Sequence, residues 1–130
     1  MIISKTPIRL TLFGGGTDYP LFFKKYGGET LSFAINKYSY VIVKKNNLHN
    51  DYKYFLSYKN IEKVNRISKI KHPSIRETLK FMKINDGLEI HYTGDIPAKT
   101  GLGSSSSFTV GLLKSLYGYL NKKKNKKQIA

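Results

Sequence analysis

The segment at residues 97–113, PAKTGLGSSSSFTVGLL, combines glycine, serine and lysine in a pattern that could bind an anion. Its four consecutive serines follow a Gly-Leu-Gly turn, a composition that also occurs in flexible linkers. Beyond the serines, however, apolar residues recur at helical spacing: Phe108, Leu112, Leu113, Leu116, Tyr117 and Leu120. This spacing predicts that the serines open an amphipathic helix, which a linker would have no reason to do.

The chemistry expected of such a helix start is the binding of phosphate. The first four backbone N–H groups of a helix have no partner within it, and the helix dipole adds partial positive charge there. Gly101 and Gly103 let the backbone approach a ligand closely, and Ser104–Ser107 add hydroxyls for phosphate oxygens or a metal ion. Lys99 contributes a positive charge, and no acidic residue follows Asp95.

Two widespread phosphate-binding motifs do not fit this loop, because GxxxxGK[ST] is absent and Ser106 replaces the last glycine of GxGxxG. The segment PAKTGLGSSSS does fit the pattern P-x-x-x-G-L-G-S-S-[ASG]-[ASG], and it resembles the second motif of the GHMP kinases. Near the N-terminus, TPIRLTLFGGGTDYP resembles the first motif of that family, P-x-[RK] followed by an apolar strand, a glycine and T-D-Y. Both motifs occur in the family's order, so the resemblance extends over nearly the whole chain.

The form of the first motif narrows the resemblance. Galactokinases carry Glu-His where this chain has Gly15-Gly16, whereas the GGGTD form is similar to sugar kinases related to D-glycero-D-manno-heptose 7-phosphate kinase. Two glycines would also leave space for a larger or already phosphorylated sugar. The resemblance implies an ATP-dependent kinase that acts on a sugar or sugar phosphate of the heptose 7-phosphate type, in polysaccharide or nucleotide-sugar synthesis.

The resemblance also implies roles for individual residues. ATP would be held by a set from the second motif: Pro97, Lys99, Gly101, Leu102, Gly103, Ser104, Ser105, Ser106 and Ser107. Of these, Ser105 would give its hydroxyl to Mg²⁺. Asp18, with Gly15 and Gly16, would bind the sugar. Arg9 would lie near the transferred phosphoryl group, where a fixed cation stabilises developing charge.

Kinases of this family place their general base Asp, a Mg²⁺-binding Glu and a third glycine-rich motif after the second motif, and the sequence ends at Ala130 before any of them. We therefore expect residues 1–130 to be a truncated GHMP kinase N-terminal domain without its C-terminal domain, and poorly active alone. Apolar surface left exposed by that loss favours self-association, so we expect a homodimer.

Composition limits the partners. The net charge is +15, yet only Arg9, Arg66 and Arg76 of the 23 basic residues are arginine, the residue most used to recognise phosphates and bases. We therefore do not expect a nucleic acid partner. A basic nucleic-acid-binding module and a catalytically inactive kinase homologue remain the alternative interpretations. There are no cysteines and no stretch long enough to span a membrane, so we expect a cytoplasmic protein without a membrane partner.

The expected strands and helices show which elements carry the two motifs. Hydrophobic patterns predict strands at 1–13, 30–44, 54–58 and 88–92, with the third pairing back on the second across a hairpin loop. Helices are expected at 21–26, at 73–84 and after the serines, where Gly111 and Gly118 would let the helix lie close to a neighbour. The fold class is α+β, and the family resemblance implies an incomplete sandwich like domain 2 of ribosomal protein S5.

Overall fold

The computed structural model describes residues 1–47, 51–97 and 104–129, apart from the side chains of Asp18, Lys126 and Lys127. Among these residues, the strands are β1 (Ile2–Phe13), β2 (Leu31–Lys45), β3 (Tyr54–Ser57), β4 (Ile61–Val64) and β5 (Leu88–Gly94). The α-helices are α1 (Pro20–Tyr26), α2 (Pro73–Phe81), α3 (Ser104–Tyr119) and α4 (Lys126–Ile129). Two short 3₁₀ helices, η1 (Gly15–Asp18) and η2 (Ile67–Lys69), complete the order.

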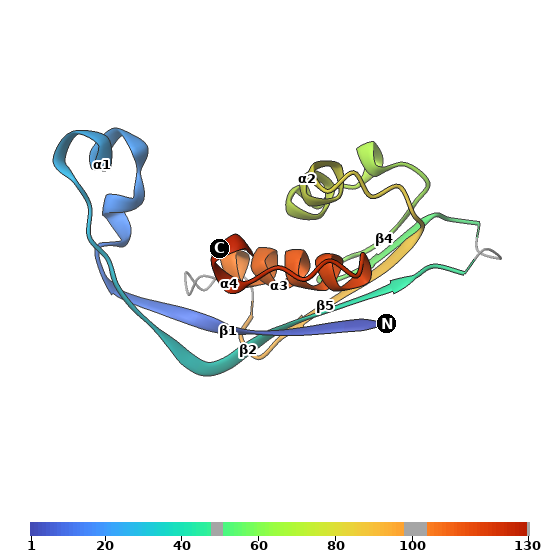
Figure 1. Cartoon of the computed structure of the whole chain (residues 1–130), viewed down its shortest axis with the longest axis horizontal. Helices are drawn as coiled ribbons and strands as arrows, with labels where there is room; N and C mark the ends of the chain where they lie inside the picture. The colour runs from blue at the N-terminus through green and yellow to red at the C-terminus, as the bar shows by residue number, and fades with distance from the viewer. Residues whose placement is uncertain (48–50, 98–103, 130) are drawn as a thin grey trace.

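The strands form one mixed sheet in the order β1-β2-β5-β3-β4. Only β3 and β5 pair in parallel, and the other neighbours are antiparallel. Helices α2 and α3 lie on the same side of the sheet (Figure 1). The α+β class expected from the sequence is confirmed, with the helices packed on one sheet.

The predicted pairing of residues 54–58 with the preceding long strand is wrong. Strand β5 lies between them, pairing with β2 through Val43 and Ile90 and with β3 through Leu56 and Ile90. Two backbone hydrogen bonds fix this insertion, from Asn46 N–H to the Gly87 carbonyl oxygen (2.9 Å) and from Leu88 N–H to the Lys53 carbonyl oxygen (3.1 Å). The start of β5 therefore lies between the end of β2 and the start of β3.

Strand β4 is absent from the sequence-based expectation, because four residues containing Glu62 and Lys63 give no apolar alternation. The helix predicted at 73–84 ends earlier, at Phe81. Lys83 takes a positive φ of 55°, a left-handed backbone conformation that cannot continue a helix. The predicted N-terminus of this helix is confirmed, because Pro73 occupies the first helical position and His72 is the N-cap.

The core lies between the sheet and the two helices. It is built from buried apolar side chains of the sheet, of α2 and of α3: Val41, Val43, Tyr54, Leu56, Leu88, Ile90, Ile75, Leu79, Phe108, Leu112 and Leu116. Burying such side chains supplies about 1.5–3 kcal/mol each relative to leaving them in water. The alternation of buried and partly exposed residues in β5 is the pattern expected for a half-buried strand.

Helix α3 lies directly against β1 and β2 because small residues face the sheet. A Cβ atom on Gly111 would lie 3.0 Å from Thr6 Oγ1, and one on Gly118 would lie 3.2 Å from Cγ2 of Ile2. The hydroxyl of Ser4 donates a hydrogen bond to the Gly111 carbonyl oxygen across this interface (2.8 Å). The expectation that both glycines permit close packing of the helix is confirmed.

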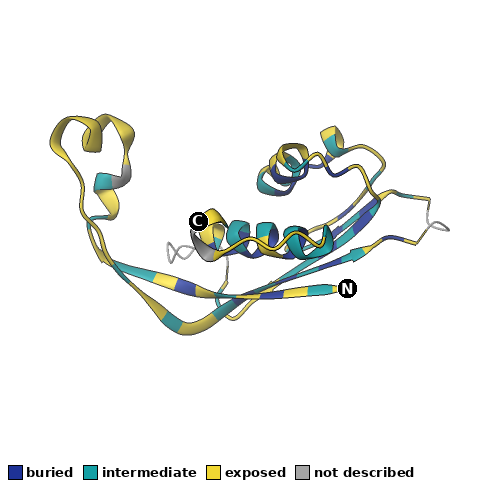
Figure 2. Ribbon diagram, viewed as in Figure 1, coloured by how far each residue is buried: buried dark blue, intermediate teal, exposed yellow. Residues whose placement is uncertain are grey.

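The distal parts of β1 and β2, together with η1 and α1, extend away from the core as an arm at residues 10–33 (Figure 1). Most of this arm is exposed (Figure 2), and no residue of α1 is buried. Large apolar side chains on it face solvent: Leu12, Phe13, Tyr19, Leu21, Phe22, Phe23, Tyr26, Leu31 and Phe33. The arm carries the part of the first sequence motif from Leu10 to Pro20.

Candidate functional site

The four serines form the first turn of α3, as the sequence predicted. Ser105 and Ser106 are exposed and Ser104 is partly exposed, whereas Ser107 is buried. No acidic residue lies in this turn. The hydroxyls and backbone N–H groups at the start of α3 therefore form a positively polarised surface that is suited to an anion.

Ser107 differs from the other three serines in what it binds. Its hydroxyl donates a hydrogen bond to the carbonyl oxygen of Pro7 in β1, at 3.0 Å, between residues that are 100 positions apart in the sequence. This bond anchors the start of α3 to the strand that carries the first motif. Ser107 thus holds the helix in place, and the exposed hydroxyls of Ser105 and Ser106 are the ones directed to solvent.

The bond to Pro7 also relates the two motifs in space. Arg9 is exposed and lies two residues further along β1, about 7 Å away at the usual rise of a strand. Helix α3 begins at the end of the sheet from which the arm extends (Figure 1). The two motifs that are distant in sequence therefore lie toward the same end of the molecule.

The three glycines of the first motif have different surroundings. Gly14 has a φ of 85°, and a Cβ atom there would lie 1.8 Å from the carbonyl oxygen of Glu29, so only glycine fits. By contrast, a Cβ atom on Gly15 would meet only a methyl group of Thr11, at 3.9 Å, and one on Gly16 would meet nothing within 4 Å. The space that the sequence predicted around these two glycines is present.

The hydroxyl of Thr17 donates to the carbonyl oxygens of Gly14 (2.7 Å) and Glu29 (3.3 Å), which closes the turn at the end of the arm. Asp18 ends η1, and its side chain lies outside the described residues. Lys99, Gly101, Leu102 and Gly103 also fall outside the described residues. Their expected roles in nucleotide binding remain predictions.

A cleft of about 400 Å³ opens where β5 ends and the second motif begins. Its walls come from the β3–β4 turn and from the end of β5: Tyr58, Lys59, Tyr92, Thr93, Gly94, Ile96 and Pro97. The ring of Tyr92 packs edge-on against Phe108, which directly follows the four serines in α3, at 5.0 Å between ring centroids. The cleft is therefore coupled through one aromatic contact to the helix start that carries the serines, a connection that the sequence did not indicate.

Within the described part of the chain, no group of three or more His, Cys, Asp or Glu side chains could hold a metal ion. No helix there is long and apolar enough to cross a membrane. The buried carboxylate of Glu62 lies next to the cleft, since it accepts a hydrogen bond from Tyr58, one of the cleft residues.

Comparison with known proteins identifies the family of this chain. A model of the GHMP kinases N terminal domain matches residues 65–130, which include the second motif. The chain belongs to the GHMP kinase family. The family expected from the two sequence motifs is thereby confirmed.

Two curated GHMP kinases illustrate the similarity. The D-glycero-alpha-D-manno-heptose 7-phosphate kinase of Campylobacter jejuni is 30% identical over 129 residues, which is 92% of this chain and 38% of that protein. The mevalonate kinase of Methanocaldococcus jannaschii is 37% identical over 59 residues, which is 44% of this chain and 19% of that protein. The chain therefore spans well under half the length of either relative.

Among solved GHMP kinase structures, a D-glycero-D-manno-heptose 1-phosphate kinase from Bacteroides thetaiotaomicron superposes with a TM-score of 0.80 at 23% identity. The match covers 99% of this chain and 45% of that one. At this identity the match shows that this chain shares the fold of the corresponding part of that kinase.

Proposed function

We propose that this chain forms the nucleotide-binding part of an ATP-dependent sugar kinase. The observation that carries the proposal is the start of α3, where the exposed side chains of Ser105 and Ser106 lie at a helix N-terminus with no acidic residue in the first turn. ATP phosphates are the anions that fit such a site in a GHMP kinase. Positioning and charge stabilisation are most of what a phosphoryl-transfer site supplies.

The nucleotide would occupy two adjoining regions. Its phosphates would lie against Ser104, Ser105 and Ser106, while Ser107 stays bonded to Pro7. Its planar base would lie in the cleft between Tyr58 and Tyr92, whose rings offer a stacking surface. The volume of about 400 Å³ is in the range of small-molecule sites.

Mg²⁺ fits this arrangement as an ion held chiefly by the nucleotide. Magnesium in kinase sites takes one or two protein ligands in addition to phosphate oxygens and water, and the exposed hydroxyl of Ser105 can supply one of them. When bound, the ion neutralises phosphate charge. Lys99 would add positive charge from the same loop.

The sugar or sugar phosphate would bind near η1. The open space at Gly15 and Gly16 accommodates a bulky acceptor, and Asp18 would bind its hydroxyls. Arg9, exposed on the strand between this region and the Pro7 contact, would stabilise the transferred phosphoryl group. The curated relative is named for a heptose 7-phosphate, and we propose an acceptor of that type.

The nucleotide proposal is tested by following backbone amide resonances during titration with magnesium and the non-hydrolysable ATP analogue AMPPNP. The expected result is saturable shifts at Ser104–Ser106 and at Tyr92, with little change at α2. Shifts confined to scattered surface lysines would contradict a site at α3.

The acceptor proposal is tested with Gly16→Val and with heptose phosphates as ligands. A Cβ atom at Gly16 meets nothing in the protein, so the variant should fold normally and lose affinity for the sugar phosphate while keeping AMPPNP affinity. Unchanged sugar phosphate affinity would place the acceptor elsewhere.

Because ATP is an intracellular metabolite, we also propose a cytoplasmic location.

We propose further that the arm mediates association between copies of this chain. Its exposed apolar side chains include Leu21, 92% exposed, and Phe13, 71% exposed. Exposed apolar side chains gathered on one segment are typical of an interaction site. Sedimentation should show a dimer that Leu21→Asp converts to a monomer. A wild-type monomer at high concentration would refute this arrangement.

A further inference from the structure

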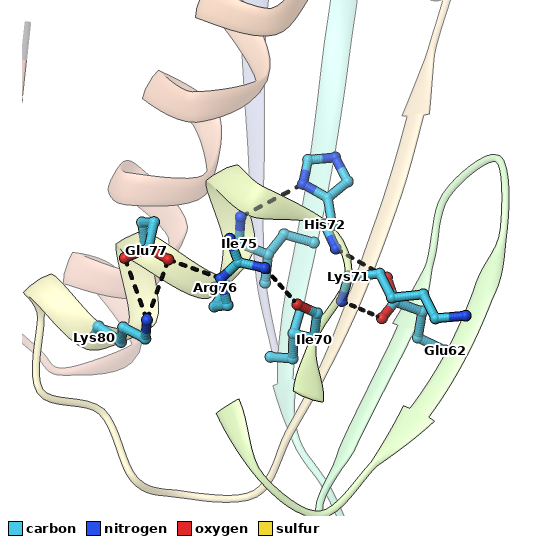
Figure 3. Close-up of polar contacts among 8 residues, drawn as sticks. All are labelled: Glu62, Ile70, Lys71, His72, Ile75, Arg76, Glu77 and Lys80. Carbon is cyan, nitrogen blue, oxygen red and sulfur yellow. Dashed lines mark hydrogen bonds and ion pairs between the residues drawn. The ribbon is translucent and has the colours of Figure 1, made fainter. Parts of the chain in front are cut away.

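A buried carboxylate lies behind the aromatic cleft. Glu62 of β4 is only 7% exposed and accepts hydrogen bonds from the Tyr58 hydroxyl, from Lys71 N–H (2.7 Å) and from His72 N–H (3.2 Å). Figure 3 shows the two backbone contacts, made where the chain enters α2. One side chain thus joins the turn that bears Tyr58 to the N-terminus of α2.

The ring of His72 continues this connection to α3. It packs edge-on against Tyr58, at 4.8 Å between centroids, and contacts Phe108 at 5.1 Å. Phe108 in turn contacts Tyr92, the other aromatic wall of the cleft. The His72 Nδ1 atom accepts a long hydrogen bond from Ile75 N–H (3.5 Å), which caps α2.

The protonation states agree with these contacts. Burial lowers the pKa of His72, although the charge of Glu62 opposes that effect, so the ring is neutral at pH 7 and its Nδ1 can accept. Burial alone would raise the pKa of Glu62, but the hydrogen bonds from Tyr58, Lys71 and His72 outweigh it and lower the pKa. Glu62 is therefore an ionised acceptor, which makes its bond to Tyr58 a strong one.

We propose that Glu62 and His72 are positioning residues for nucleotide binding, which hold Tyr58 and Phe108 so that the cleft and the start of α3 keep a fixed relation. This inference rests on the proposed function. Glu62 fixes the Tyr58 ring through its hydroxyl, and His72 fills the space between that ring and Phe108. Because the Tyr58 wall of the cleft is already ordered before binding, the ligand does not have to pay the entropic cost of ordering it. This strengthens binding of the nucleotide base.

The deciding variant is Tyr58→Phe, which keeps the ring and removes only the bond to Glu62. Tyr119→Phe is a matched control, because the Tyr119 hydroxyl also donates to a carboxylate, that of Asp86 (3.2 Å), at the other end of α3. Two probes separate the parts of the site: magnesium with AMPPNP, and magnesium with tripolyphosphate, which lacks the nucleoside.

Tyr58→Phe should weaken AMPPNP binding by about 3- to 10-fold, the cost of ordering one released side chain on binding, and leave tripolyphosphate binding unchanged. Tyr119→Phe should change neither. Glu62→Gln should lower AMPPNP affinity in the same direction, and its effect should not add to that of Tyr58→Phe, since both remove one interaction.

Wild-type affinity of Tyr58→Phe for AMPPNP would overturn the inference, as would an equal loss of both probes, which would mean that the cluster only supports the fold. In both of those outcomes the proposed function would stand. If the wild-type chain binds neither probe, the proposed function fails and the inference fails with it.

Discussion

Replacing Gly111 by alanine measures how tightly α3 is held on the sheet. An added Cβ atom would lie 3.0 Å from Thr6 Oγ1, 3.1 Å from Ser4 Oγ and 3.3 Å from Val41 Cγ2. Alanine gains about 1 kcal/mol over glycine within a helix. Overpacking a filled interior costs about 1–3 kcal/mol. Ser4 is bonded to the Gly111 carbonyl oxygen and Val41 lies in the sheet centre, so neither can move easily. The difference leaves Gly111→Ala less stable by up to about 2 kcal/mol.

Gly118→Ala is the matched control in the same helix. Its Cβ atom would meet only the side chain of Ile2, with Cγ2 at 3.2 Å, and that partly exposed side chain near the chain terminus can rotate away. The helix gain should therefore survive, leaving this variant unchanged or up to about 1 kcal/mol more stable. Urea unfolding followed by far-UV circular dichroism gives both values. Finding Gly111→Ala as stable as Gly118→Ala would refute the close packing of α3 on β1.

Three further predictions concern stability. Ser107→Ala should lower the free energy of unfolding by about 1 kcal/mol through loss of the hydrogen bond to Pro7. Ser106→Ala should not lower it, because the Ser106 side chain is exposed. Equal urea midpoints of the two variants would contradict this prediction. Because burial lowers the pKa of His72 below its usual 6.5, the unfolded chain binds more protons in that range, so the free energy of unfolding should fall as the pH drops through 6.5. His72→Asn, which keeps an N-cap residue, should flatten that dependence in urea titrations at several pH values, and an unaltered slope would exclude His72 as its source. Gly14→Ala should destabilise the arm by at least about 1 kcal/mol because of its positive φ and the close Glu29 carbonyl, seen as faster proteolysis at residues 14–28; a wild-type cleavage rate would argue against this turn.

The elements that local sequence signals specify were predicted well. The serine-started helix and the close approach of Gly111 and Gly118 follow from spacing along one segment, and the structure shows both. The partner of the strand at residues 54–58 could not be found this way. Its place beside β5 depends on hydrogen bonds from Asn46 and Leu88 to residues distant in the sequence, which no local pattern encodes.

The candidate site shows the same division. The exposed serines and the open space at Gly15 and Gly16 were predicted from motif chemistry. The structural role of Ser107 was not, because a run of four serines does not show which hydroxyl turns toward Pro7. Glu62 and His72 appeared as unrelated single residues in the sequence, and folding brings them together beside the cleft.

Calorimetric titration of the chain with magnesium and AMPPNP tests the central claim most directly, using Ser105→Ala and, as a matched control, the exposed Ser68→Ala in η2. The account predicts saturable binding at one site, weakened about tenfold in Ser105→Ala by loss of a hydrogen bond to a charged ligand, and unchanged in Ser68→Ala. Absence of saturable binding, or equal affinity of Ser105→Ala and the wild-type chain, would contradict the assignment of the α3 start as the phosphate site.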